Sequence, residues 1–125
     1  MTKSIIAGLV ALVLVVSAGV VEVIVLRNRY EELYEECCEV LEISKKEELT
    51  TERFNEFRKH WESLRETSEL FLPHQDTYEI NLRFAEAQAY VEQQDFAQVV
   101  AQLSVVEELL EYVPHLMTPS FNHIV

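Results

Sequence analysis

The feature that most constrains this chain is a long apolar stretch near its N-terminus. From Ile5 to Leu26 the residues are almost all aliphatic or small, and Glu22 is the one charged side chain among them. As a helix the stretch extends about 33 Å, at a rise of about 1.5 Å per residue, and the hydrocarbon core of a bilayer is about 30 Å thick. It therefore predicts one transmembrane helix, and we assign residues 1–26 to a single-pass membrane anchor.

A cleaved signal peptide is the weaker interpretation of this stretch. The small-residue triplet Val16, Ser17 and Ala18 fits a signal-peptidase pattern. The apolar region of a signal peptide is usually only about 7 to 15 residues long, and here the triplet lies inside a longer run. We therefore expect an uncleaved signal-anchor, with cleavage after Ala18 as the alternative.

Glu22 needs an explanation, because a carboxylate in lipid is costly. One interpretation is that the membrane boundary lies near Glu22 and the side chain reaches the headgroups. The other is that Glu22 faces a polar or basic group on a partner membrane helix. A seam for close helix packing is available, formed by small residues at Ala7, Ala11 and Ala18 with Gly8 and Gly19 beside them.

The direction of insertion depends on a nearly balanced distribution of basic residues. Lys3 and the free amino group precede the anchor, and Arg27 and Arg29 follow it. The short N-terminal tail favours a cytoplasmic N-terminus and an extracytoplasmic C-terminal domain in the cell membrane, although the arginine pair argues for the reverse.

The part after the anchor is strongly acidic. Tyr30 to Val125 contains seven of the ten basic and 21 of the 22 acidic residues, a formal charge of −14. Such a surface repels phosphate backbones, so we expect no nucleic acid partner. The expected membrane contact is the lipid around the N-terminal helix.

The fold class that we predict is all-α. Both glycines lie in the anchor, and the remainder is rich in Glu, Leu, Gln and Ala. Apolar residues at 3-4 spacing follow directly after the anchor and predict a stalk helix over residues 27–43. Ser44 with Glu47 fits a capping box for the next helix, although Thr50 and Thr51 are also typical of a helix start. Residues 44–125 are then a small antiparallel helical bundle with a short tail.

Three further helices are expected within this bundle. The second helix of the chain carries a seam at alternating three- and four-residue spacing and ends at Pro73; the seam consists of Phe54, Phe57, Trp61, Leu64, Ser68 and Phe71. The third, about residues 75–93, has two apolar lines and is predicted to be central; the lines are Tyr78, Leu82, Ala85, Ala89 and Ile80, Phe84, Ala87, Val91. Asp95 with Gln98 caps the fourth, which extends to Pro114. The short turn before it predicts an antiparallel hairpin similar to a single tetratricopeptide unit.

The adjacent pair Cys37 and Cys38 is a candidate interaction feature. Cys37 lies on the apolar line and is most simply a core or interface residue, whereas Cys38 is turned partly away. If the helix dimerises outside the cell, either thiol can bridge two copies.

His74 and Asp76, at the start of the third helix, have two interpretations. Asp near a helix N-terminus is favoured by the backbone dipole, so capping is the simpler one. The alternative is a metal site, with Glu56 and His60 or Glu111 and His115 as further ligands. A di-iron bundle needs two Glu-x-x-His motifs, and the sequence has none. Zinc held by three or four of these groups stays as the alternative. We predict no metal site and no cofactor.

No motif of enzyme chemistry is present. The sequence has no glycine-rich phosphate loop and no nucleophile elbow. We accordingly predict no catalytic residues and no enzymatic activity.

The order of motifs along the chain resembles a known family. An N-terminal anchor, a helix bearing Trp61, the stretch "LFLPHQDTYEINL", Asp95 before the last helix, "EYVPHL" and a terminal "NHIV" are together similar to the bacterial domain-of-unknown-function family numbered 4363. His123 departs from that family's ending. The resemblance implies an uncharacterised, membrane-anchored helical protein of a Gram-positive bacterium, without catalytic residues. It also suggests association with multi-span membrane proteins of the YetF-like kind.

Two functional hypotheses follow. In the first, the protein is a membrane-tethered interaction module that associates with itself or with a multi-span membrane protein, with Glu22, Cys37, Cys38, His74 and Asp76 as candidate interaction residues. In the second, it is an extracytoplasmic bundle that senses a ligand or a metal ion.

Overall fold

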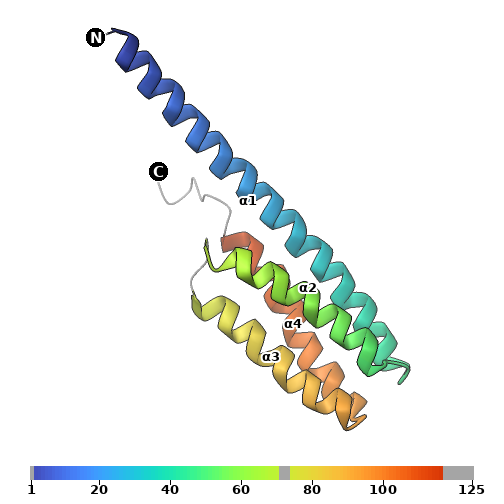
Figure 1. Cartoon of the computed structure of the whole chain (residues 1–125). Helices are drawn as coiled ribbons and strands as arrows, with labels where there is room; N and C mark the ends of the chain where they lie inside the picture. Colours follow the sequence, from blue (N-terminus) through green and yellow to red (C-terminus); the bar gives the residue numbers. More distant parts are fainter. Residues whose placement is uncertain (1, 71–73, 117–125) are drawn as a thin grey trace.

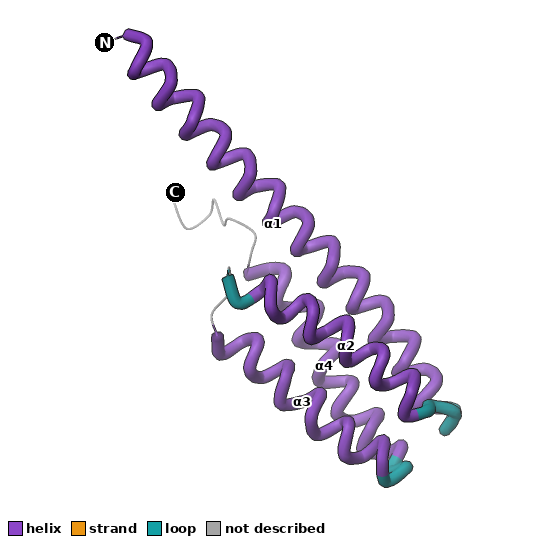
Figure 2. The backbone as a smooth tube through the Cα atoms, in the orientation of Figure 1, coloured by secondary structure: helices purple, strands orange, loops and turns teal. Residues whose placement is uncertain are grey.

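The computed structural model describes residues 2–70 and 74–116, and over these residues it contains four helices and no strand. The helices are α1 (Thr2–Lys45), α2 (Thr51–Ser68), α3 (His74–Glu92) and α4 (Phe96–Leu116). Figure 1 shows α1 projecting far beyond the other three, and Figure 2 shows how short the described connections are. The predicted all-α class is confirmed.

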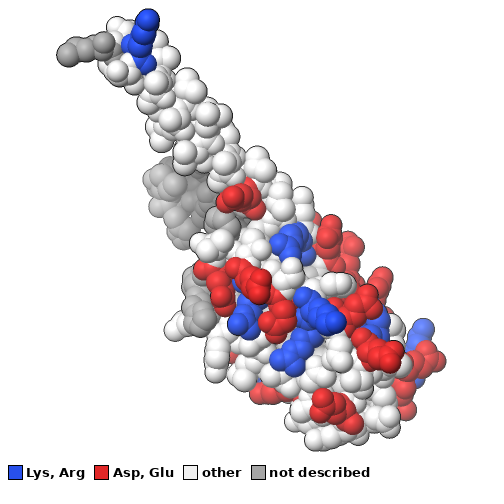
Figure 3. Space-filling view, viewed as in Figure 1, with Lys and Arg blue, Asp and Glu red and all other residues white. Residues whose placement is uncertain are grey.

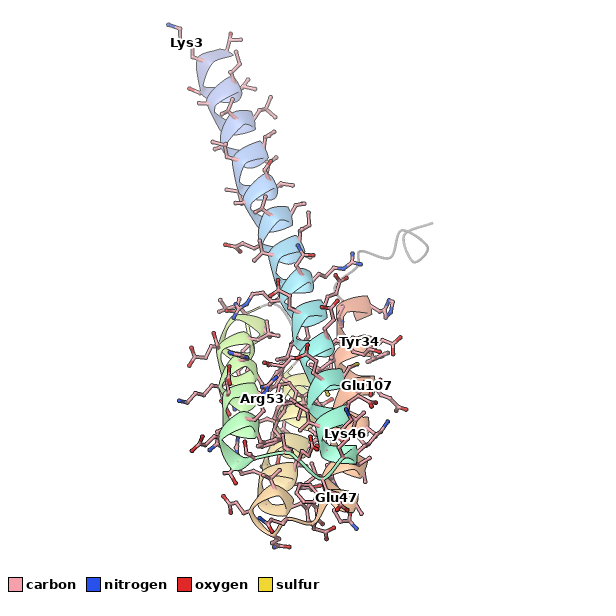
Figure 4. The ribbon with its side chains drawn as sticks, turned by 90° about the vertical axis from the view of Figure 1, so that its right-hand side faces the viewer. Lys3, Tyr34, Lys46, Glu47, Arg53 and Glu107 are labelled. Atoms are coloured by element: carbon pink, nitrogen blue, oxygen red, sulfur yellow. The ribbon has the colours of Figure 1, made fainter. Side chains whose placement is uncertain are left out.

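Helix α1 is one continuous helix with two different environments. Its first part, as far as Val25, carries exposed aliphatic side chains and is long and apolar enough to cross a membrane. From Leu26 onward it buries one side chain in every three or four residues. Residues 27–43, which we predicted as a stalk, therefore pack as the first helix of the bundle (Figure 4), because their apolar stripe is covered by α2 and α4.

The four helices form an antiparallel ring. Helix α1 packs against α2 and α4, and α3 packs against the same two helices from the opposite side. Within the described residues, the backbones of neither diagonal pair approach each other closely. Two adjacent edges, α1 with α4 and α3 with α4, share the most extensive packing.

An aromatic cluster fills the centre of the bundle. The rings of Trp61 and Phe84 are stacked with centroids 5.7 Å apart, and Tyr30 meets Trp61 edge-on at 6.5 Å. Phe57 lies 4.9 Å from Phe84. The seam predicted on α2 is buried from Phe54 to Ser68, and Phe71 and Pro73 lie outside the described residues.

Helix α3 is not central, contrary to our prediction. Only its second apolar line is buried, whereas Tyr78 and Leu82 are 58% and 39% exposed. The reason is the position of α1: its C-terminal half supplies the fourth wall of the core, so α3 needs to bury only one face.

Helices α1 and α3 end in the same way, each in a tight turn that leads to the next helix. Glu47 and Gln94 have positive φ angles of 59° and 56°, and the residue after each donates its N–H to the carbonyl five residues earlier. These are Schellman motifs, in which glycine is the usual left-handed residue. The chain has no glycine after Gly19, so a glutamate and a glutamine adopt this conformation.

The predicted capping box of Ser44 with Glu47 is wrong. Ser44 lies inside α1, where its hydroxyl donates to the carbonyl of Val40 at 2.8 Å. The cap of α2 is Thr50, whose Oγ1 accepts from the N–H of Arg53 at 3.1 Å. Continuation of the buried stripe through Ser44 explains the difference, because leaving the helix earlier would expose Leu41.

The predicted start of α4 is correct, but the helix ends later than predicted. Asp95 Oδ1 accepts from the N–H of Gln98 at 3.3 Å, as expected of an N-cap. The helix then continues past Pro114 to Leu116.

Candidate functional site

The predicted interaction residues do not meet at one place. Glu22 is exposed on α1, beyond the bundle, and Cys37 is buried in the core against α4. Asp76 lies in the first turn of α3, at the end of the bundle from which α1 projects; we call this the span-side end. His74 opens α3, and its side chain lies outside the described part.

The two cysteines have different environments. Cys37 is fully buried, with its Sγ 3.6 Å from the carbonyl of Leu103, and burial strongly raises the pKa of its thiol. Cys38 is half-buried, and its pKa is also raised, mainly by burial and then by the charge of Glu107. Cys38 is therefore the thiol that can reach a second molecule without unfolding of the bundle.

A buried polar contact ties α1 to α2 at the span-side end. Tyr30 Oη and Ser68 Oγ lie 2.7 Å apart, and Ser68 also donates to the carbonyl of Leu64 at 2.7 Å. Burial raises the pKa of Tyr30 to about 12, and the negative charge of Asp76 acts in the same direction. Asp76 lies in the first turn of α3, at this same end of the bundle.

Two surface grooves between α1 and α2 meet at Arg29. The groove nearer the projecting part of α1 is largely apolar, about 220 Å³, and is lined by Val21, Glu22, Val25, Leu26, Arg29, Thr67 and Leu70. The second continues along the bundle, about 370 Å³, and is lined by Arg29, Glu32, Leu33, Glu36, His60, Ser63 and Leu64. We call the two together the Arg29 groove.

In the far part of the Arg29 groove, the carboxylate of Glu36 already has two partners. His60 Nδ1 lies 2.8 Å from Glu36 Oε1, and Arg53 Nη1 lies 3.4 Å from Glu36 Oε2. His60 therefore pairs across helices with Glu36, not with Glu56 on its own helix. Figure 4 labels Arg53 on α2, beside α1.

No candidate metal centre emerges from the described residues. Within 2–70 and 74–116, no three His, Cys, Asp or Glu side chains are grouped so that they could hold a metal ion. The described cysteines are free thiols.

Charge is distributed unevenly along the molecule. Figure 3 shows the projecting part of α1 almost without charged side chains, whereas red and blue side chains gather over the bundle. The exposed side chains of that part include Leu9, Val13 and Val20, each more than half exposed. An exposed apolar helix of this length is unfavourable in water, and by length and composition it could cross a membrane.

The family follows from a match over most of the chain. The model of the family described as "Domain of unknown function (DUF4363)" matches residues 22–124. The chain belongs to this family. The DUF4363 match includes the bundle half of α1 together with the other three helices. Searches of curated proteins and of solved structures found no match to this DUF4363 chain.

Sequence reasoning missed Arg29, Ser63 and Thr67 as site residues. From the sequence, Arg29 was considered only as a basic residue that flanks the anchor and affects the direction of insertion. A signal was present: Glu22, Arg29 and Glu36 are spaced by seven residues and so share one face of α1. Ser63 and Thr67 are four residues apart and likewise share a face of α2. What the sequence did not show is that these two faces meet.

Proposed function

We propose that this protein is a membrane-tethered interaction module, which crosses the cell membrane once and uses its anchor and bundle to associate with itself or with a multi-span membrane protein. The observation that carries this proposal is the continuity of α1. The same helix is exposed and apolar as far as Val25 and is a core element of the bundle from Leu26 to Ser44.

This continuity couples the two parts mechanically. Leu26 and Tyr30 are at most 1% exposed, so the bundle begins at the end of the apolar run, with no flexible linker between. A partner that binds the anchor therefore fixes the position and orientation of the bundle, and the reverse also holds. Such coupling suits a module that connects a membrane partner with events at the surface.

The face of α1 that carries its two glycines is suited to association within the membrane. At about 100° per residue, Gly8 and Gly19 lie on the same side of α1 as the core residues Leu26 and Cys37. A Cβ added at either glycine would meet nothing within 4 Å. A partner helix on this face would occupy, within the membrane, the side of α1 that α2 and α4 cover in the bundle.

The test is crosslinking of the full-length chain in native membranes, after alkaline extraction has established that it is integral. Gly8→Leu should strongly reduce recovery of the crosslinked partner, because it fills the face needed for close approach. Ser17→Leu is the matched control, since it adds bulk on the opposite face of the same segment, and it should leave recovery unchanged. Equal recovery from both variants would exclude this face.

Glu22→Leu distinguishes the two interpretations of Glu22, contact with a partner helix or with the lipid headgroups. If Glu22 faces a partner helix, this substitution should reduce partner recovery, whereas Glu35→Leu on the exposed bundle part of α1 should not. Unchanged recovery with Glu22→Leu would leave Glu22 as a headgroup-facing residue.

A further inference from the structure

Arg29 is held in a fixed orientation without a carboxylate partner. Its Nη1 donates to Thr67 Oγ1 at 3.2 Å and its Nη2 to Ser63 Oγ at 3.1 Å. Four other arginines, Arg53, Arg58, Arg65 and Arg83, each lie within 4.0 Å of a glutamate. Within the described residues no such ion pair involves Arg29. Its positive charge is therefore positioned by two neutral hydroxyls and remains available.

The chemical character of the groove changes along α1, from largely apolar before Arg29 to acidic after it. On the side of the projecting segment the groove is largely apolar, with Val21 and Val25 on α1 and Leu70, 79% exposed, in the turn that follows α2. Arg29 follows one turn later. Glu32 comes next, about 4.5 Å further along the axis at about 1.5 Å per residue.

Glu32 is the available carboxylate on the bundle side of Arg29, whereas Glu22 lies on the other side, among the apolar residues of the groove. Glu36 is already paired with His60 and Arg53. Glu32 is exposed, and among the described residues no hydrogen bond or ion pair engages it. The groove thus offers a largely apolar wall that includes Glu22, then a fixed cation with two hydroxyls, then the carboxylate of Glu32.

We propose that the Arg29 groove binds one phospholipid with a zwitterionic, primary-ammonium headgroup of the phosphatidylethanolamine type. The phosphate accepts from the guanidinium of Arg29, which has further N–H donors, and from the hydroxyls of Ser63 and Thr67. The ammonium donates to Glu32, and the start of an acyl chain lies along Val21 and Val25. This inference rests on the proposed function, because membrane insertion of α1 places Arg29 at the level of the headgroups.

Charge complementarity favours this headgroup over an anionic one. The part of the chain after the anchor carries a formal charge of −14, which repels a lipid with net negative charge. A headgroup without net charge avoids that repulsion, and its two poles match Arg29 and Glu32 in the order in which they occur. A choline headgroup has the same charges but no N–H donor, so it should bind less well to a carboxylate.

The experiment is native mass spectrometry of the full-length chain in detergent, with phosphatidylethanolamine, phosphatidylglycerol or phosphatidylcholine of equal acyl composition. We expect one retained phosphatidylethanolamine per chain. Arg29→Gln should weaken retention by about tenfold, the loss expected for a hydrogen bond to a charged group. Arg27→Gln, a neighbouring arginine outside the groove, should retain lipid as the unchanged protein does.

Glu32→Gln tests the ammonium end with little risk to folding, because the side chain is exposed. It should reduce the preference for phosphatidylethanolamine over phosphatidylcholine, and Glu35→Gln should not. Equal retention of all three lipids, or no difference between the Arg29 and Arg27 variants, would overturn the proposal. Displacement of the lipid by millimolar inorganic phosphate would show that the site recognises phosphate alone, and would also overturn it.

Failure of the lipid site and failure of the proposed function give different results. A chain that resists alkaline extraction but retains no phosphatidylethanolamine refutes only the lipid site. A chain released from membranes by alkali refutes the membrane-tethered module, and the lipid site with it.

Discussion

Tyr30 Oη and Ser68 Oγ lie 2.7 Å apart in a fully buried hydrogen bond that joins α1 to the last turn of α2. Tyr30 comes four residues after the end of the apolar run, so this contact is where the projecting helix becomes part of the bundle. It holds α2 against α1 at the span-side end, beside the Arg29 groove.

The contact predicts a loss of stability at alkaline pH. The pKa of Tyr30 is about 12 in the folded chain and 10.0 when the chain is unfolded. Below pH 10 both states keep the proton and this group adds no pH dependence. Between pH 10 and 12 only the unfolded state loses it, so the free energy of unfolding should fall by up to about 1.4 kcal/mol per pH unit. The raised pKa of Cys37 acts in the same direction, from a lower pH.

Tyr30→Phe should separate the contribution of Tyr30 to the alkaline loss of stability from that of Cys37. It should cost about 1 kcal/mol at pH 7, the typical value of one hydrogen bond, and should flatten the loss above pH 10. Denaturation of the detergent-solubilised chain can be followed by the fluorescence of Trp61, its single tryptophan. A pH dependence unchanged by the substitution would assign the alkaline loss to other groups.

The position of α3 predicts unequal effects of two substitutions on that helix. Phe84 is fully buried against Trp61, so Phe84→Ala should destabilise the bundle by about 3 to 5 kcal/mol. Leu82 is 39% exposed, and Leu82→Ala should cost less than about 1 kcal/mol. Comparable losses in chemical denaturation would mean that both faces of α3 are buried in solution, as in the central arrangement first predicted.

The left-handed residues of the two turns predict stabilising substitutions. Glu47→Gly and Gln94→Gly should each stabilise the bundle by up to about 1 kcal/mol, because glycine adopts positive φ without a steric penalty. Glu48→Gly, at the neighbouring position of negative φ, should destabilise it instead. The melting temperatures of the three variants provide the measurement, and destabilisation by all three would argue against the Schellman geometry.

The direction of insertion is open to a labelling experiment. We expect the bundle outside the cell, so a membrane-impermeant maleimide should label Cys38 in intact cells, and more slowly than an exposed thiol because Cys38 is half-buried. Lys46→Cys in a Cys38→Ser background provides an exposed thiol in the turn before α2. Labelling of this variant only after lysis would place the bundle in the cytoplasm. A mass lacking the first 18 residues would show cleavage after Ala18.

Most of the individual helices were predictable from local signals. The α2 seam and the Asp95 cap depend on residues within a few positions of one another, and both predictions are confirmed for the described residues. Ser44 illustrates the limit of local signals. Its hydroxyl suits a cap, but burial against the rest of the bundle keeps it inside α1.

The sequence by itself determined that this chain is all-helical, that its first part is apolar enough to cross a membrane, and which stripe of each helix is apolar. These properties follow from spacing and composition, which act over one or two turns. Only the tertiary structure decided that residues 27–43 are a core helix, that α3 has one buried face, and that Arg29 meets Ser63 and Thr67. Each of these depends on which faces of separate helices pack together. Apolar stripes are similar on all four helices, so the spacing within one helix does not specify its neighbour.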